Sequence, residues 1–223
     1  MSSTTAALPS VSTGYWPRVG WILLLMGAVM AAAHALLFAT VPSYALGAVG
    51  TEVKARMFTH LAVGYSHTVG GAIASLIGPF QFVGSFRRRF PRWHVWCGRV
   101  YLVCVGLSGL AGLFLSPNSE ARNTLGIGFI LLALAWLFTG TKAYLAICAR
   151  DVESHRRWMI RNYALTYAAV TLRVQMPLLI VGGLTPVMAL NVEGWLCWIP
   201  NLILVELWIR LRGRSAIRGV AAA

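Results

Sequence analysis

The sequence has little charge, and the charge it has is almost all of one sign. Only 11% of its 223 residues are charged, and six acidic residues stand against 19 lysines and arginines. A soluble globular domain carries about 25% charged residues. Because 58% of this chain is hydrophobic, we expect lipid to cover much of its surface.

Several motifs of soluble enzymes are also missing. The sequence contains no P-loop, no GxGxxG turn, no HExxH zinc motif and no GxSxG nucleophile elbow. The four cysteines form no CxxC pair and show no metal-binding spacing, so we interpret them as small apolar packing residues. A hydrolase or kinase function therefore has no support.

Six apolar stretches predict an all-α fold, an integral membrane bundle of six transmembrane helices. A mobile tail (1–18) is expected before this single domain (19–211), and a basic tail (212–223) after it. The expected helices are about 19–39, 58–83, 93–115, 124–148, 158–181 and 195–211.

The positions of lysine and arginine predict how the helices are oriented. Fifteen of the 19 lie at one end of the expected helices or in the connections there; the others are Lys54, Arg56, Arg122 and Arg173. The positive-inside rule then places both termini in the cytoplasm. These basic runs are expected to contact lipid headgroups, so the net charge of +13 indicates the bilayer as partner and no nucleic acid.

Small residues predict where helices approach each other closely. On the second expected helix, Gly71 and Ser75 lie four residues apart, as do Ala74 and Gly78. Three glycines thin one side of the third expected helix: Gly106, Gly109 and Gly112. Helices associate through such positions in membranes, where no hydrophobic effect drives them together.

The five histidines fall into two layers. His94 and His155 lie at the inner starts of the third and fifth expected helices, whereas His34, His60 and His67 lie in the outer half of the first two. Two histidines on facing helices can bind the iron of haem b from both sides. The inner pair is the best candidate because its members share one depth.

Other residues extend this hypothesis. Arg99 and Arg161 lie near the inner histidines, where their charges suit the propionates of a haem. His34 with His67 forms a weaker outer pair of ligands. The alternative is that the inner histidines are solvated in a basic interface and that the others only hydrogen-bond between helices.

Arg173 lies inside the fifth expected helix, about five residues from its outer end. An arginine at the centre of a membrane helix costs about 2.5–3.5 kcal/mol on insertion scales. One interpretation is that Arg173 extends to the outer headgroups. The other is that it faces the bundle near His60 and His67 and binds an anionic group or a quinone carbonyl.

Glu206 is the acidic residue that lies well inside an expected helix. Its depth predicts an ion pair with a nearby arginine, because a lone charge is expensive there. The candidate partners are Arg99, Arg161 and Arg210.

Three segments carry a resemblance to a known family. They are HTVGGAIASLIGPFQF (67–82), RRRFPRWHVWCGRVY (87–101) and SHRRWMIRNYALTYAAVTLR (154–173). The chain resembles, over roughly residues 55–185, a family of uncharacterised bacterial membrane proteins, domain of unknown function number twenty-three hundred and six. The resemblance implies a multi-pass protein of the bacterial cytoplasmic (inner) membrane and implies no activity. This chain departs from the family at Val95, where an arginine usually follows the histidine.

A looser analogy at the level of fold is with b561-type cytochromes, which hold one haem between the third and fifth of six helices. The sequence has no histidine on its fourth expected helix for a second haem.

Our leading hypothesis is an electron-transfer protein that binds haem b or interacts with a quinone or a redox partner. A small-solute transporter or channel and a membrane scaffold without substrate are the alternatives. A homo-oligomer is compatible with each.

Overall fold

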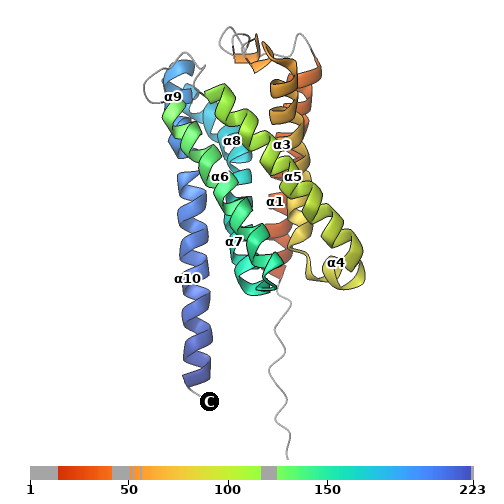
Figure 1. Cartoon of the computed structure of the whole chain (residues 1–223). Coiled ribbons are helices and arrows are strands. Elements are labelled where there is room, and N and C mark those ends of the chain that lie inside the picture. Colours follow the sequence, from red (N-terminus) through yellow and green to blue (C-terminus); the bar gives the residue numbers. More distant parts are fainter. Residues whose placement is uncertain (1–14, 42–50, 52, 56, 117–124, 222–223) are drawn as a thin grey trace, which may run out of the picture.

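The computed structural model describes residues 15–41, 51, 53–55, 57–116 and 125–221, and the regular structure in these residues is helical (Figure 1). The tail expected over residues 1–18 falls mostly outside them. The helices are α1 (Tyr15–Thr40), α3 (Leu61–Gln81), α4 (Gly84–Arg89), α5 (Pro91–Leu115), α6 (Leu125–Cys148), α7 (Val152–Thr166), α8 (Ala168–Val181), α9 (Pro186–Leu196) and α10 (Ile199–Ala221).

Six spans in the described part of the chain are long and apolar enough to cross a membrane, which confirms the all-α, six-helix prediction. Two of them consist of two consecutive helices, α7 with α8 and α9 with α10. The spans are Arg18–Thr40, Leu61–Gln81, Pro91–Leu115, Gly126–Cys148, Val152–Val181 and Pro186–Arg212.

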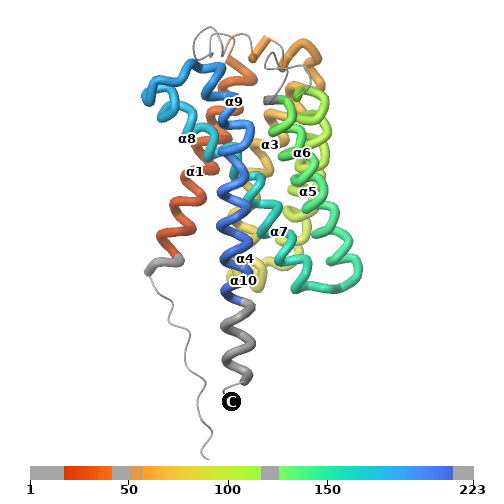
Figure 2. Tube along the Cα trace, turned by 90° about the vertical axis from the view of Figure 1, so that its left-hand side faces the viewer, coloured from red at the N-terminus to blue at the C-terminus, as the bar shows by residue number. Residues whose placement is uncertain are grey.

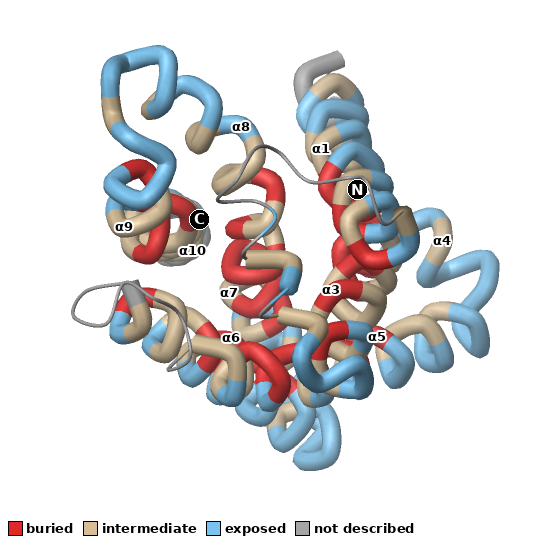
Figure 3. The backbone as a smooth tube through the Cα atoms, turned by 90° about the horizontal axis from the view of Figure 1, so that it is seen from above, coloured by how far each residue is buried: buried red, intermediate tan, exposed pale blue. Residues whose placement is uncertain are grey.

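The surface of the bundle is apolar, as lipid requires. Leu23, Val103 and Leu178 are each at least 60% exposed, although large aliphatic side chains are usually buried in soluble proteins. The buried residues of α1, α3, α6 and α7 face the interior, and the exposed ones face outward (Figure 3). The chain is thus an integral membrane protein whose polar side chains are concentrated inside.

The fifth and sixth spans are each interrupted at one point. Where α7 ends, the Thr166 hydroxyl donates to the Asn162 carbonyl one turn earlier, and such bonds bend helices. Between α9 and α10 the chain turns at Cys197–Trp198, just before Pro200, which has no backbone N–H to continue a helix.

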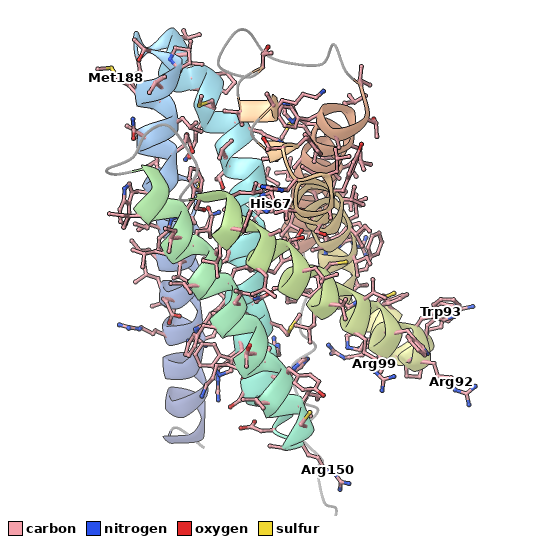
Figure 4. All side chains as sticks on the ribbon, turned by 45° about the horizontal axis from the view of Figure 1, so that its top comes forward. His67, Arg92, Trp93, Arg99, Arg150 and Met188 are labelled. Carbon is pink, nitrogen blue, oxygen red and sulfur yellow. The ribbon has the colours of Figure 1, made fainter. Side chains whose placement is uncertain are left out.

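Helix α1 begins and α10 ends at the same end of the bundle, which we call the inner end (Figures 1 and 2). The opposite end, where α9 begins, is the outer end. Arg92, Arg99 and Arg150 lie toward the inner end, and Met188 lies at the outer end (Figure 4). This separation agrees with the predicted concentration of arginines at one end of the helices. That the inner end lies on the cytoplasmic side of the membrane stays a prediction.

The turn between α6 and α7 is held by helix-end chemistry. Arg150 adopts a left-handed conformation (φ 59°) just after α6, a position at which a helix commonly ends. Asp151 then caps α7 by accepting a hydrogen bond from the Ser154 backbone N–H at 2.9 Å. That bond holds the pKa of the Asp151 carboxyl below its usual value.

Some of the predicted small residues lie where helices meet, whereas a Cβ added to Gly71 or Gly106 would meet no atom within 4 Å. A Cβ atom added to Gly78 of α3 would lie 2.0 Å from the Tyr163 ring of α7, so this glycine makes room for the tyrosine. A Cβ at Gly109 of α5 would lie 2.7 Å from the Leu137 side chain of α6. These close approaches bring α3 against α7 and α5 against α6.

Candidate functional site

A network of hydrogen bonds joins α5, α6 and α7 in the middle of the bundle. The Tyr101 hydroxyl donates to Asn162 Oδ1 at 2.7 Å and lies 2.7 Å from Thr166 Oγ1. Asn162 Nδ2 donates to the Trp136 carbonyl, and the Trp136 indole N–H donates to Thr166 Oγ1 at 2.9 Å. Tyr101 and Asn162 have no exposed surface. The network therefore fills the centre of the bundle with buried polar groups that hydrogen-bond to one another.

Replacing Thr166 with valine is expected to lower the free energy of unfolding by about 1–2 kcal/mol. Valine keeps the shape but removes the oxygen that the Trp136 N–H needs. Thr141→Val is the matched control, because the exposed Thr141 hydroxyl donates to a carbonyl of its own helix. Titration with a denaturing detergent measures both variants, and equal effects would show that the network contributes nothing.

Three of the predicted outer residues meet in the outer half of the bundle. Arg173 of α8 lies within range of electrostatic interaction with His34 of α1 and with His67 of α3. Its Nη1 donates to the Ala169 carbonyl at 2.6 Å, so the head group is directed back along its own helix. The interaction with His67 favours the bundle-facing interpretation, and the binding role of Arg173 stays a prediction.

His67 is fixed by a bond to a neighbouring helix. Its Nδ1 lies 3.1 Å from the Ser108 carbonyl of α5, and since a carbonyl only accepts, Nδ1 must carry the proton. The other nitrogen, Nε2, then has a free lone pair when the ring is neutral. His67 is labelled in Figure 4 and lies on α3, with its ring against Gly112 as well as Ser108 of α5. The remaining outer histidine, His60, directly precedes α3 as its N-cap. Its ring lies nearly perpendicular to the Phe114 ring, with the ring centroids 5.3 Å apart.

The two inner histidines lie within electrostatic range of each other, His94 near the start of α5 and His155 near the start of α7. His155 Nδ1 donates to the Ala143 carbonyl of α6 at 2.9 Å, which leaves its Nε2 with a lone pair. His94 Nδ1 is buried and has no hydrogen-bond partner among the described residues. Among the charged groups, Arg87 of α4 has the largest electrostatic effect on His94.

The two arginines predicted beside this pair are placed differently. Arg161 is bound to Glu206 of α10 by a two-bond ion pair, whose longer bond is 3.1 Å, so the predicted partner of Glu206 is identified. Arg99 lies over the Trp96 ring at 5.3 Å and lines a groove of about 410 Å³ between α5 and α6. The Arg161 guanidinium is therefore held in an ion pair with Glu206, whereas the Arg99 side chain is exposed.

Glu193 is a buried acid that the sequence reasoning missed. It has no exposed surface, and it lies in α9 because the sixth span begins at Pro186 and not near residue 195. Thr185 caps this helix by accepting from the Met188 N–H, and Pro186 follows at its first position. A capping threonine followed by proline is a helix-start signal that could have revealed the longer span.

Within the described residues, no three histidine, cysteine, aspartate or glutamate side chains are grouped so that they could hold a metal ion. A haem with two axial histidines needs only two protein ligands, so this finding does not bear on the inner pair.

Comparison with known proteins identifies a family and nothing closer. The model of a family described as predicted membrane protein (DUF2306) matches residues 64–209, nearly two thirds of the chain. No curated protein and no solved structure matches significantly. The matched region runs from the start of α3 to α10 and includes both inner histidines, His67 and Arg173.

Proposed function

Since the chain belongs to the DUF2306 family of predicted membrane proteins, which gives no activity, we propose a function from its own geometry. We propose that it is an electron-transfer protein of the bacterial inner membrane that binds haem b between His94 and His155. The observation that carries the proposal is that His155 acts electrostatically on His94 and that both lie near the inner ends of their helices.

The hydrogen bond of His155 supports its role as a ligand. Histidines that bind metals usually donate the N–H of their second nitrogen to a carboxylate or a backbone carbonyl, which fixes the ring. His155 makes this bond to Ala143, so its Nε2 lone pair is oriented by α6. The side chain is thus prepared to bind iron without rearrangement of its own ring.

His94 supports the proposal through a group that lacks a partner. A buried N–H or ring nitrogen without a hydrogen bond is costly, so it calls for an explanation. Nδ1 of His94 is in this position among the described residues, and so is Nε2 of Gln81 at the end of α3. A bound group with polar atoms would satisfy both.

The charges around the pair suit a group with carboxylates. Arg87 acts electrostatically on His94, and Arg99 is exposed on the same helix as His94, so both are available to propionates. Arg161 is not, because Glu206 already binds it. Haem b would supply one-electron chemistry at this position.

The outer cluster of His34, His67 and Arg173 supports interaction with a quinone. Nε2 of His67 can accept a hydrogen bond from a quinol hydroxyl, and a guanidinium can donate to a quinone carbonyl. The two functions would then lie at opposite ends of the bundle, with the hydrogen-bond network of Tyr101 and Asn162 between them.

The packed network favours electron transfer over transport of a solute. A transporter needs a hydrated path between the two ends, whereas Tyr101, Ser108 and Asn162 have no exposed surface. Electrons can cross a packed layer of protein. The structure of the centre therefore supports the first hypothesis more than the transport alternative.

Haem content of the purified protein tests the proposal. Protein from haem-replete cells, solubilised in a mild detergent, is expected to contain about one haem b per chain by the pyridine haemochrome assay, given one pair of axial ligands. A negligible haem content under the same conditions would refute it.

A further inference from the structure

We infer that Glu193 of α9 and Gln175 of α8 form a proton-binding site in the outer half of the bundle, separate from both histidine layers. Neither oxygen of the Glu193 carboxyl has a hydrogen-bond partner among the described residues, and the same holds for the buried Oε1 of Gln175. Glu193 itself has no exposed surface. Three acceptor oxygens are thus buried without a donor.

The register of the two helices places these side chains at one depth. Thr171 Oγ1 of α8 donates to the Cys197 carbonyl at the end of α9 at 2.7 Å. Gln175 follows Thr171 by one turn, and Glu193 precedes Cys197 by one turn. Because α8 and α9 run in opposite directions and pack together, the two side chains occupy corresponding positions.

Among the described residues, no cation forms an ion pair with Glu193. Helix α6, which packs against α9, carries Lys142 only near its inner end. The described charged side chains of α10 are Glu206, Arg210 and Arg212, and they also lie on the inner side. On α8, Arg173 interacts with His34 and His67, and the described residues form no ion pair with Glu193.

A proton gives partners to two of the three unmatched oxygens. An ionised carboxylate without a partner is strongly disfavoured in an apolar interior, so the group takes up a proton instead. The resulting hydroxyl can donate to Gln175 Oε1, which needs a donor. Ionisable residues inside membranes commonly belong to proton relays. The arrangement therefore fits a carboxyl that holds a proton.

Infrared spectroscopy of the detergent-solubilised protein tests the inference. At neutral pH we expect the C=O stretching band of a protonated carboxyl, shifted by exchange into D₂O. Glu193→Gln, which has nearly the same shape and no acidic proton, is expected to lose this band. A spectrum of the unsubstituted protein without the band would show that Glu193 is ionised and would overturn the inference in favour of a cation site.

A chemical probe gives a second test that needs no variant. A hydrophobic carbodiimide adds to a protonated carboxyl: the acid proton moves to a carbodiimide nitrogen and the carboxyl oxygen bonds to the central carbon. An acyl shift to nitrogen then gives a stable adduct, and no group leaves.

Mass spectrometry is expected to find roughly tenfold more adduct at Glu193 than at Glu206, because each pH unit of difference in proton affinity changes the protonated fraction about tenfold. Glu206 is the internal control, since Arg161 holds its carboxyl as the anion. Equal or lower modification of Glu193 would contradict the inference. Either result is independent of haem content.

Discussion

Replacing His155 with alanine is expected to abolish the Soret absorbance band of the purified protein. The substitution removes one of the two proposed axial ligands and leaves His94 as the single remaining one. His94→Ala is expected to have the same effect for the same reason. Absorbance spectra before and after reduction with dithionite measure the result.

His60→Ala is the matched control for these variants. His60 lies at the outer end of the bundle against Phe114, away from the inner pair, so its removal should leave the band unchanged. A band that survives in both His94→Ala and His155→Ala would assign the ligands to other residues. A band lost only in His60→Ala would place the cofactor at the outer end.

Replacing Gly78 with leucine is expected to lower the free energy of unfolding by about 3 kcal/mol or more, at the upper end of overpacking effects. Even a Cβ atom would lie 2.0 Å from the Tyr163 ring, so α3 and α7 would have to separate. The ring has little room to move, because its hydroxyl donates to the Ser75 carbonyl. Denaturation with detergent measures the loss.

Gly71→Leu tests whether helix propensity or the close contact is responsible. Gly71 lies two turns earlier on α3, and a Cβ there would meet no atom within 4 Å. We expect this variant to be at least as stable as the unsubstituted protein, since leucine favours helices more than glycine does. A similar loss in both variants would show that the Gly78 contact is unimportant.

The architecture could be predicted from the sequence because lipid imposes simple rules. Apolar length identifies a span, and the distribution of arginines separates its two ends. The structure has six such spans with the arginines near the inner end, and Arg161 pairs with Glu206 as one of three predicted partners. These results depend on depth alone, which residue number gives directly.

The contacts between helices could not be predicted, because they depend on rotation and crossing angle. Thr166 and Trp136 are unremarkable in the sequence, yet they join two helices through one hydrogen bond. Arg173 had two interpretations until the packing of α8 turned it toward His67. Glu193 was missed because the expected sixth helix began after it, although Thr185 and Pro186 mark its real start.

The two histidine layers illustrate the same division. Their depths followed from the sequence, and in the structure His155 acts electrostatically on His94, as Arg173 does on His34 and His67. The bonds from His67 to Ser108 and from His155 to Ala143 needed the fold. Those bonds determine which ring nitrogen is free, and therefore what each histidine can bind.

Electron paramagnetic resonance of the oxidised protein tests the central claim most directly, because it reports the ligands of the iron itself. We expect the low-spin ferric signal of a haem with two imidazole ligands, lost in His155→Ala while that protein remains folded by circular dichroism. A purely high-spin signal, or no haem iron in protein from haem-replete cells, would contradict haem binding between His94 and His155.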